Sequence, residues 1–163
     1  LQFRPKEVEA RPVDLREVAD RSLAFCEHRM KQKCVSGNNL LEKELPLVKG
    51  DPLELQQVFL NILMNAVDAC SEKDGRVEIS GRVCDDYVKV TFSDNGKGMD
   101  EAELSRCMDI FYTTKEVGEG TGLGLSMGYQ IIVEKHGGDL LVASEQGVGT
   151  TFTIKLPKVA VGY

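Results

Sequence analysis

The sequence of 163 residues predicts an α+β fold in which about three helices gather on one face of a mixed, mostly antiparallel sheet of about five strands. Three observations predict it. Two long segments, 15–33 and 52–71, place apolar residues three and four apart, as amphipathic helices do. Two later segments, 76–93 and 139–156, each hold a pair of alternating stretches around a turn. Strands that come in pairs disfavour a parallel sheet of βαβ units.

The predicted helices have recognisable ends. Asp14 is suited to cap the helix over 15–33. Asp51-Pro52 is a capping residue followed by proline in the first turn, which predicts the start of the helix over 52–71. A third helix is predicted over 122–136, because the two glycines that follow can supply the positive φ of a helix C-cap.

The remaining segments complete the domain. Asp85-Asp86 predicts the turn of the first hairpin, and residues 146–149 the turn of the second. Residues 1–13 contain two prolines and are predicted to be a linker, residues 14–157 the domain, and residues 158–163 a C-terminal tail. The predicted strands are 39–45, 76–82, 86–93, 139–144 and 150–156.

Composition narrows the function classes. The net charge of −6 disfavours nucleic-acid binding, which usually shows as a basic patch, but it does not disfavour a phosphate site built from local donors. Five cysteines without CxxC spacing indicate reduced, mostly buried thiols and a cytoplasmic setting. No apolar stretch reaches the roughly 20 residues that span a bilayer, so this domain is expected to make no membrane contact, even if its parent protein is anchored.

Asn61 and Asn65 form the first candidate constellation. They are four residues apart and therefore share one side of the helix over 52–71, at the border of its apolar face. Amide oxygens can bind Mg²⁺ beside the phosphates of a nucleotide. The alternative is that both side chains simply face solvent.

Two glycine-rich runs form the others. In Asp94-Asn95-Gly96-Lys97-Gly98 the carboxylate can accept a hydrogen bond from an exocyclic amine such as that of adenine, and the glycines allow close approach of backbone to a ligand. The run 118–124 leads into a helix, whose first N–H groups can bind an anion. Residues 111–117 before it suggest a lid, with Lys115 as a phosphate contact. A plain turn and a surface loop are the alternatives.

Together these segments resemble the GHKL superfamily of gyrase, heat-shock chaperone, histidine kinase and mismatch-repair ATPases, and specifically its histidine kinase branch. Residues 57–69 are similar to the N box and 94–98 to the G1 box. Residues 111–115 are similar to the F box, 120–125 to the G2 box, and 149–152 to the closing strand motif. Each box alone is a weak signal, but the ordered set makes coincidence improbable.

The resemblance implies the Bergerat fold, a two-layer α/β sandwich that binds ATP and Mg²⁺. It implies that Asp94 holds adenine and that Asn65, helped by Asn61, holds Mg²⁺; Asn61 and Lys115 are the expected catalytic residues. Thr150 or Thr151 is expected near the base, and the sequence leaves that choice open. The implied nucleotide-binding residues are Asn61, Asn65, Asp68, Ala69, Asp94, Gly96, Gly98, Met99, Phe111, Thr113, Thr114, Lys115, Gly120, Thr121, Gly122, Leu123, Gly124, Leu125, Thr150 and Thr151.

Asn61 also bears on the reaction. The hydrolysing members of the superfamily carry at this position a glutamate that acts as general base for water. An amide cannot take a proton at neutral pH, so the sequence favours transfer of the γ-phosphoryl group over hydrolysis. A GHKL ATPase, a serine-directed kinase and a nucleotide-sensing module remain as alternatives.

Neither histidine is expected to accept the phosphoryl group. His28 lies inside the helix over 15–33, and His136 ends the helix over 122–136. The resemblance therefore implies a phosphoacceptor histidine on a separate helical hairpin domain of the same parent protein, upstream of the linker. A response regulator would be an indirect partner, and the domain would be cytoplasmic.

Overall fold

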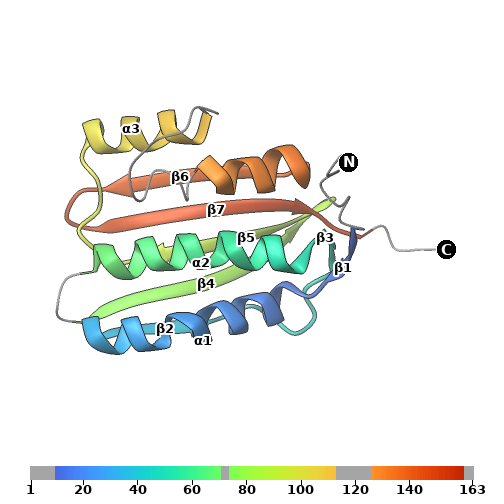
Figure 1. Ribbon diagram of the computed structural model, residues 1–163, viewed down its shortest axis with the longest axis horizontal. Helices are drawn as coiled ribbons and strands as arrows, with labels where there is room; N and C mark the ends of the chain where they lie inside the picture. The colour runs from blue at the N-terminus through green and yellow to red at the C-terminus, as the bar shows by residue number, and fades with distance from the viewer. Residues whose placement is uncertain (1–9, 71–73, 113–125, 160–163) are drawn as a thin grey trace, which may run out of the picture.

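The computed structural model describes residues 10–70, 74–112 and 126–159, and for residues 110–112 it describes the backbone alone. Within these ranges the chain folds as two layers, with helices over one face of a five-stranded sheet (Figure 1). The predicted fold class is confirmed. No helix in the described ranges is long and apolar enough to cross a membrane.

The two long helices begin where the capping residues predict. Helix α1 is Leu15–Lys33, and the Asp14 carboxylate accepts hydrogen bonds from the N–H groups of Arg16 and Glu17. Helix α2 is Pro52–Ala69, and the Asp51 carboxylate accepts one from Leu53. α1 ends at Cys34, which takes a left-handed conformation with φ 55°.

The five-stranded sheet has the order β2-β4-β5-β7-β6. Its strands are β2 (Val35–Asn39), β4 (Gly75–Cys84), β5 (Tyr87–Asp94), β6 (Asp139–Glu145) and β7 (Gly149–Pro157). β2 runs parallel to β4, and all other neighbours are antiparallel. β1 (Arg11–Val13) and β3 (Val48–Gly50) form a separate antiparallel pair.

The core lies between the sheet and the helices. α1, α2 and the π-helical segment η1 (Gln130–Lys135) lie side by side over one face of the sheet (Figure 1). Phe59 of α2 and Phe92 of β5 are fully buried and meet edge to face, with ring centroids 4.9 Å apart. Because side chains alternate along a strand, Thr91 next to Phe92 lies on the uncovered face, where it is half-buried.

Three elements differ from the prediction. The first strand is β2 at 35–39 rather than 39–45, because α1 ends at Cys34 and the chain pairs at once with β4. Residues 11–13, expected in the linker, form β1 against β3. Helix α3 (Glu101–Tyr112) lies in a segment expected to be loop. Its signal is a capping box, in which Asp100 and Glu103 each accept the other's backbone N–H, at 2.8 and 3.1 Å.

Candidate functional site

Asn61 and Asn65 lie on α2 as predicted, and both side chains are half-buried. The Asn61 Nδ2 atom is buried and has no hydrogen-bond partner among the residues that the structure describes. A buried amide without a partner is costly, so this atom is a candidate contact for a ligand. Since a half-turn of the side chain exchanges the amide oxygen and nitrogen, the position can offer either a donor to a phosphate or an acceptor to a cation.

Asp94 is the last residue of β5, the central strand, at the end of the sheet where α2 also ends (Figure 1). Its Oδ1 accepts two backbone hydrogen bonds, from Gly96 at 2.8 Å and from Thr150 at 3.2 Å. Burial raises the pKa of the Asp94 carboxyl above its usual value, and these two hydrogen bonds offset part of the rise. Both bonds end on Oδ1, so Oδ2 of this oriented carboxylate is the oxygen suited to accept from an exocyclic amine.

The glycines of the run 94–98 are required by the protein's own backbone. A Cβ on Gly96 would collide with the carbonyl of Ala69, in the last turn of α2. Gly98 has φ +69°, and a Cβ there would collide with the carbonyl of Glu145. We expected these glycines to allow approach of a ligand, but the close approach in the structure is between the loop and the two elements that flank it.

Backbone hydrogen bonds hold the loop in the same place. Lys97 N–H donates to the Ala69 carbonyl at 2.9 Å, and Gly147 N–H donates to the Lys97 carbonyl at 2.7 Å. The loop is therefore fixed to α2 on one side and to the β6–β7 turn on the other.

Asn95 is a residue of this loop whose role the sequence did not reveal. Its Oδ1 accepts from Arg76 N–H at 2.6 Å, and its Nδ2 donates to the Asp74 carbonyl at 2.8 Å. The Cys70 thiol lies 3.8 Å from the same Oδ1. Asn95, which directly follows Asp94, therefore ties this loop to the start of β4. Asn in a Gly-rich turn was the only signal, and it does not distinguish a ligand contact from this backbone clamp.

Thr150 is the threonine that lies beside Asp94. It shares the helix-covered face of β7 with Phe152, and its exposed fraction is 6%. Its hydroxyl lies 2.7 Å from the Ser144 hydroxyl, which accepts from Met99 N–H at 2.8 Å. Thr151 lies on the other face because strand side chains alternate. Ser144, which sequence reasoning missed, thus links Thr150 to the loop after Asp94.

The contacts from Met99 through Ser144 and Thr150 to Asp94 form a relay of hydrogen bonds. An open cavity of about 520 Å³ lies beside this relay, between the start of α3 and the β6–β7 turn. Met99 and Ser144 line it, so one side of the relay faces the cavity and the other faces Asp94. The other lining residues are Asp100, Glu101, Ala102, Leu104, Glu145 and Gln146.

Two expected nucleotide residues at the end of α2 have structural contacts. The Asp68 carboxylate pairs with Arg29 of α1, with nitrogen–oxygen distances of 2.8 and 3.1 Å, and the Lys33 ammonium donates to the Asp68 carbonyl. Asp68 thus ties α2 to α1. Ala69 contributes its carbonyl to the loop at Lys97.

Most of the expected lid, from residue 113 onward, lies outside the described residues. Phe111 belongs to the last turn of α3, and its side chain is not described. The other expected contacts of this segment are Thr113, Thr114, Lys115, Gly120, Thr121, Gly122, Leu123, Gly124 and Leu125, which all lie in the undescribed range 113–125.

Residues 50–160 match the family of histidine kinase-, DNA gyrase B- and HSP90-like ATPases. The chain belongs to this family. The match begins one residue before the N-cap of α2 and ends just beyond β7, so it contains Asn61, Asn65, Asp94 and Thr150. The family supports ATP as the nucleotide that this domain binds.

Three curated relatives similar to this chain are named as kinases. Sporulation kinase E of Bacillus subtilis is 44% identical over 115 residues, which cover 70% of this chain and 15% of that protein. Sensor histidine kinase ZraS of Klebsiella oxytoca is 37% identical over 155 residues, 94% of this chain and 33% of that protein. AtoS of Escherichia coli is 37% identical over 159 residues, 96% of this chain and 26% of that protein. The chain thus spans a third or less of these relatives.

Solved structures match at the level of one domain. The catalytic domain of histidine kinase ThkA has a TM-score of 0.77 at 26% identity, covering 93% of this chain and 97% of that one. The mycobacterial sensor histidine kinase MprB has a TM-score of 0.73 at 29% identity, covering 91% and 97%. ShkA, solved in complex with AMPPNP, has a TM-score of 0.79 at 25% identity, covering 96% and 33%. The chain is an ATP-binding catalytic domain of the histidine kinase type.

Proposed function

We propose that this domain transfers the γ-phosphoryl group of Mg·ATP to a histidine on a separate helical hairpin domain of its parent protein, from which a response regulator receives it. One observation supports transfer most directly: the half-buried position 61 of α2 holds an amide rather than a carboxylate, and its buried nitrogen has no partner within the described ranges. An amide can orient a phosphate but cannot deprotonate water.

The adenine contact would be the Asp94 carboxylate. It is positioned before any ligand arrives, because Gly96 and Thr150 hold its Oδ1 and Asn95 holds the adjoining turn. Such preorganisation lowers the cost of ordering the site on binding. Burial raises the pKa of this carboxyl because the charged form is poorly solvated, so a hydrogen bond that a bound amine donates to the carboxylate gains strength from the burial.

The residues present fit Mg²⁺. In the described ranges, no group of three or more His, Cys, Asp or Glu side chains could hold a metal. Asn65, helped by Asn61, would instead provide amide oxygens, with the remaining ligands coming from phosphates and water. When bound, the ion neutralises phosphate charge that the two amides cannot neutralise by themselves.

The histidines of this chain support an acceptor on another domain. His28 lies on α1 with its side chain exposed, and no contact ties it to Asp94 among the described residues. His136 has both ring nitrogens within hydrogen-bond distance of backbone atoms. We therefore assign the acceptor to a hairpin domain.

The cysteines, all free thiols, support a cytoplasmic location. The acidic net charge supports the absence of nucleic acid as a partner.

Labelled ATP tests the proposal. The domain is mixed with the hairpin domain of the same parent protein, and with a control hairpin whose acceptor histidine is replaced by glutamine. We expect acid-labile label on the first hairpin alone, and little free phosphate. Asn61→Glu should raise phosphate release, because it supplies a base for water. Robust phosphate release by the unmodified domain with no labelled hairpin would reject phosphotransfer in favour of hydrolysis.

A further inference from the structure

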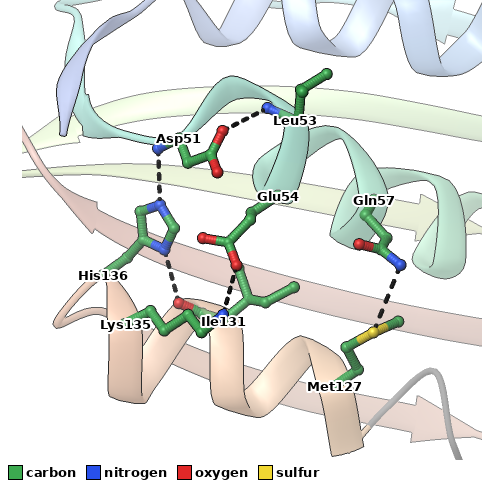
Figure 2. A network of polar contacts seen from close by, with 8 residues as sticks. All are labelled: Asp51, Leu53, Glu54, Gln57, Met127, Ile131, Lys135 and His136. Atoms are coloured by element: carbon green, nitrogen blue, oxygen red, sulfur yellow. Dashed lines mark hydrogen bonds and ion pairs between the residues drawn. The ribbon is translucent and has the colours of Figure 1, made fainter. Parts of the chain in front are cut away.

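A row of polar contacts joins α2 to a helical segment whose described part starts at Ser126 (Figure 2). Asp51 N–H donates to His136 Nε2 at 3.0 Å, the Lys135 ammonium pairs with the Glu54 carboxylate at 2.6 Å, and the Gln57 amide donates to Met127 Sδ at 3.5 Å. We call these three contacts the α2–η1 seam.

The partners of His136 determine which ring nitrogen bears the proton. Nε2 faces a backbone N–H, so it must accept. Nδ1 lies 2.7 Å from the Ile131 carbonyl, so it must donate. Only the neutral tautomer protonated at Nδ1 satisfies both contacts. A residue that ends a helix can make the Nδ1 contact, whereas the Nε2 contact reaches another element, at the start of α2.

The ring also has no room to shift. A Cβ on Gly50 would lie 2.5 Å from His136 Cδ2 and 2.7 Å from Nε2, so the ring packs directly on the backbone before α2. The Ile131 carbonyl accepts both from the ring and from the His136 backbone N–H, at 3.0 Å. That backbone bond spans five residues, so the π-helical geometry of η1 places the ring where it reaches α2.

His136 is the strongest contact of the seam. The Lys135 side chain is 60% exposed, and exposed ion pairs contribute little. A thioether sulfur is a weak acceptor for Gln57. The His136 contact, in contrast, satisfies a part-buried backbone N–H at the start of α2, a group that costs free energy when left unpaired.

The seam lies on the same stripe of α2 as the metal-binding candidates. Residues 54, 57, 61 and 65 follow one another at spacings of three and four, so Asn61 and Asn65 continue the row that begins at Glu54. Any rotation or shift of α2 relative to the segment after residue 126 therefore moves both amides relative to that segment.

We propose that His136 is a positioning residue for the nucleotide site: it locks α2, and with it Asn61 and Asn65, against the helical segment that follows residue 125. This inference rests on the proposed function for its consequence in nucleotide binding, and on the seam alone for its geometry.

Two variants and one control test it. His136→Phe fills the space of the ring without an acceptor, and His136→Gln returns an amide oxygen to accept from Asp51. Val88→Ala, in the core at the start of β5, is the control for general destabilisation. ATP affinity is measured by calorimetry with Mg²⁺, and the side-chain amide signals of Asn61 and Asn65 by NMR of the ligand-free domain.

We expect His136→Phe to weaken ATP binding about tenfold and to shift both amide signals, since small displacements of positioned groups have large effects. His136→Gln should restore most of the affinity, and Val88→Ala should change neither readout. Unmoved amide signals with unchanged ATP affinity would overturn the inference, as would an equal loss of ATP affinity in Val88→Ala.

If His136→Phe does not fold, the nitrogen chemical shifts of the His136 ring in the unmodified domain decide: a tautomer protonated at Nε2 overturns the inference. If the unmodified domain binds no ATP, the proposed function fails, while the amide signals still decide the seam.

Discussion

Replacement of Asp94 by asparagine should weaken nucleotide binding and stabilise the free domain at the same time. Asp94→Asn keeps an oxygen that can accept from Gly96 and Thr150, so the loop keeps its conformation. It replaces the other carboxylate oxygen by an NH₂ group, which would face the exocyclic amine of adenine with a donor instead of an acceptor.

The size of the effect on binding follows from the single hydrogen bond that the variant cannot form with adenine. Because the two backbone hydrogen bonds to Oδ1 survive, the variant forgoes one hydrogen bond to a charged group, about 1.5–3 kcal/mol. Since 1.4 kcal/mol is a factor of ten, ATP affinity should fall about 10- to 150-fold.

The effect on stability has the opposite sign. Burial raises the pKa of Asp94, so between the unfolded and folded values the folded state binds more protons than the unfolded state. Stability therefore falls as pH rises through this window, and the full cost of the buried charge is present above the folded pKa. At neutral pH the asparagine variant escapes that cost. ATP affinity of the unmodified domain should fall as pH drops through the raised pKa, because the protonated carboxyl is a poorer acceptor.

Calorimetry with ATP and Mg²⁺ measures the affinity, and urea unfolding of the free domain at several pH values measures the stability. The matched control is Asp68→Asn, since that carboxylate pairs with Arg29 on the surface. Equal ATP affinity in Asp94→Asn and the unmodified domain would refute the adenine assignment. A variant less stable than the unmodified domain at neutral pH would refute the argument from burial.

Further predictions concern the elements that hold the site. Asp68→Asn should leave ATP affinity within about twofold and cost at most about 1 kcal/mol in urea unfolding, because its partner is a surface arginine; a large affinity loss would restore Asp68 to the nucleotide site. Gly96→Ala should cost about 1–3 kcal/mol of unfolding free energy and weaken ATP binding, because the Cβ meets the Ala69 carbonyl; normal ATP binding by calorimetry would show that the loop can yield. Asn95→Ala should cost about 1 kcal/mol and weaken ATP binding more than Asn95→Asp, which keeps the acceptor for Arg76 N–H; equal affinities would show that the acceptor is not what positions the loop.

Local signals predicted the elements that depend on local chemistry. Asp14 and Asp51 cap helices because the capping contact lies within three residues of each. The strand pairs around residues 85–86 and 146–148 follow from alternation and short turns. β2 was misplaced because its sequence, Val-Ser-Gly-Asn-Asn, has no strand pattern and is held by pairing with β4. α3 was missed although its capping box was visible, because the surrounding glycines suggested a loop.

The sequence by itself determined that this chain is a nucleotide-binding α+β domain and which residues are candidates for the nucleotide site, because order and spacing of the boxes are properties of the chain. Only the tertiary structure decided how these residues are supported. The β5–β7 register places Thr150 opposite Asp94, and the alternation of β7 sends Thr151 to the other face. Contacts distant in sequence gave Asn95, Ser144 and His136 their roles: each bonds to backbone or hydroxyl groups from another element, and no local pattern encodes those partners.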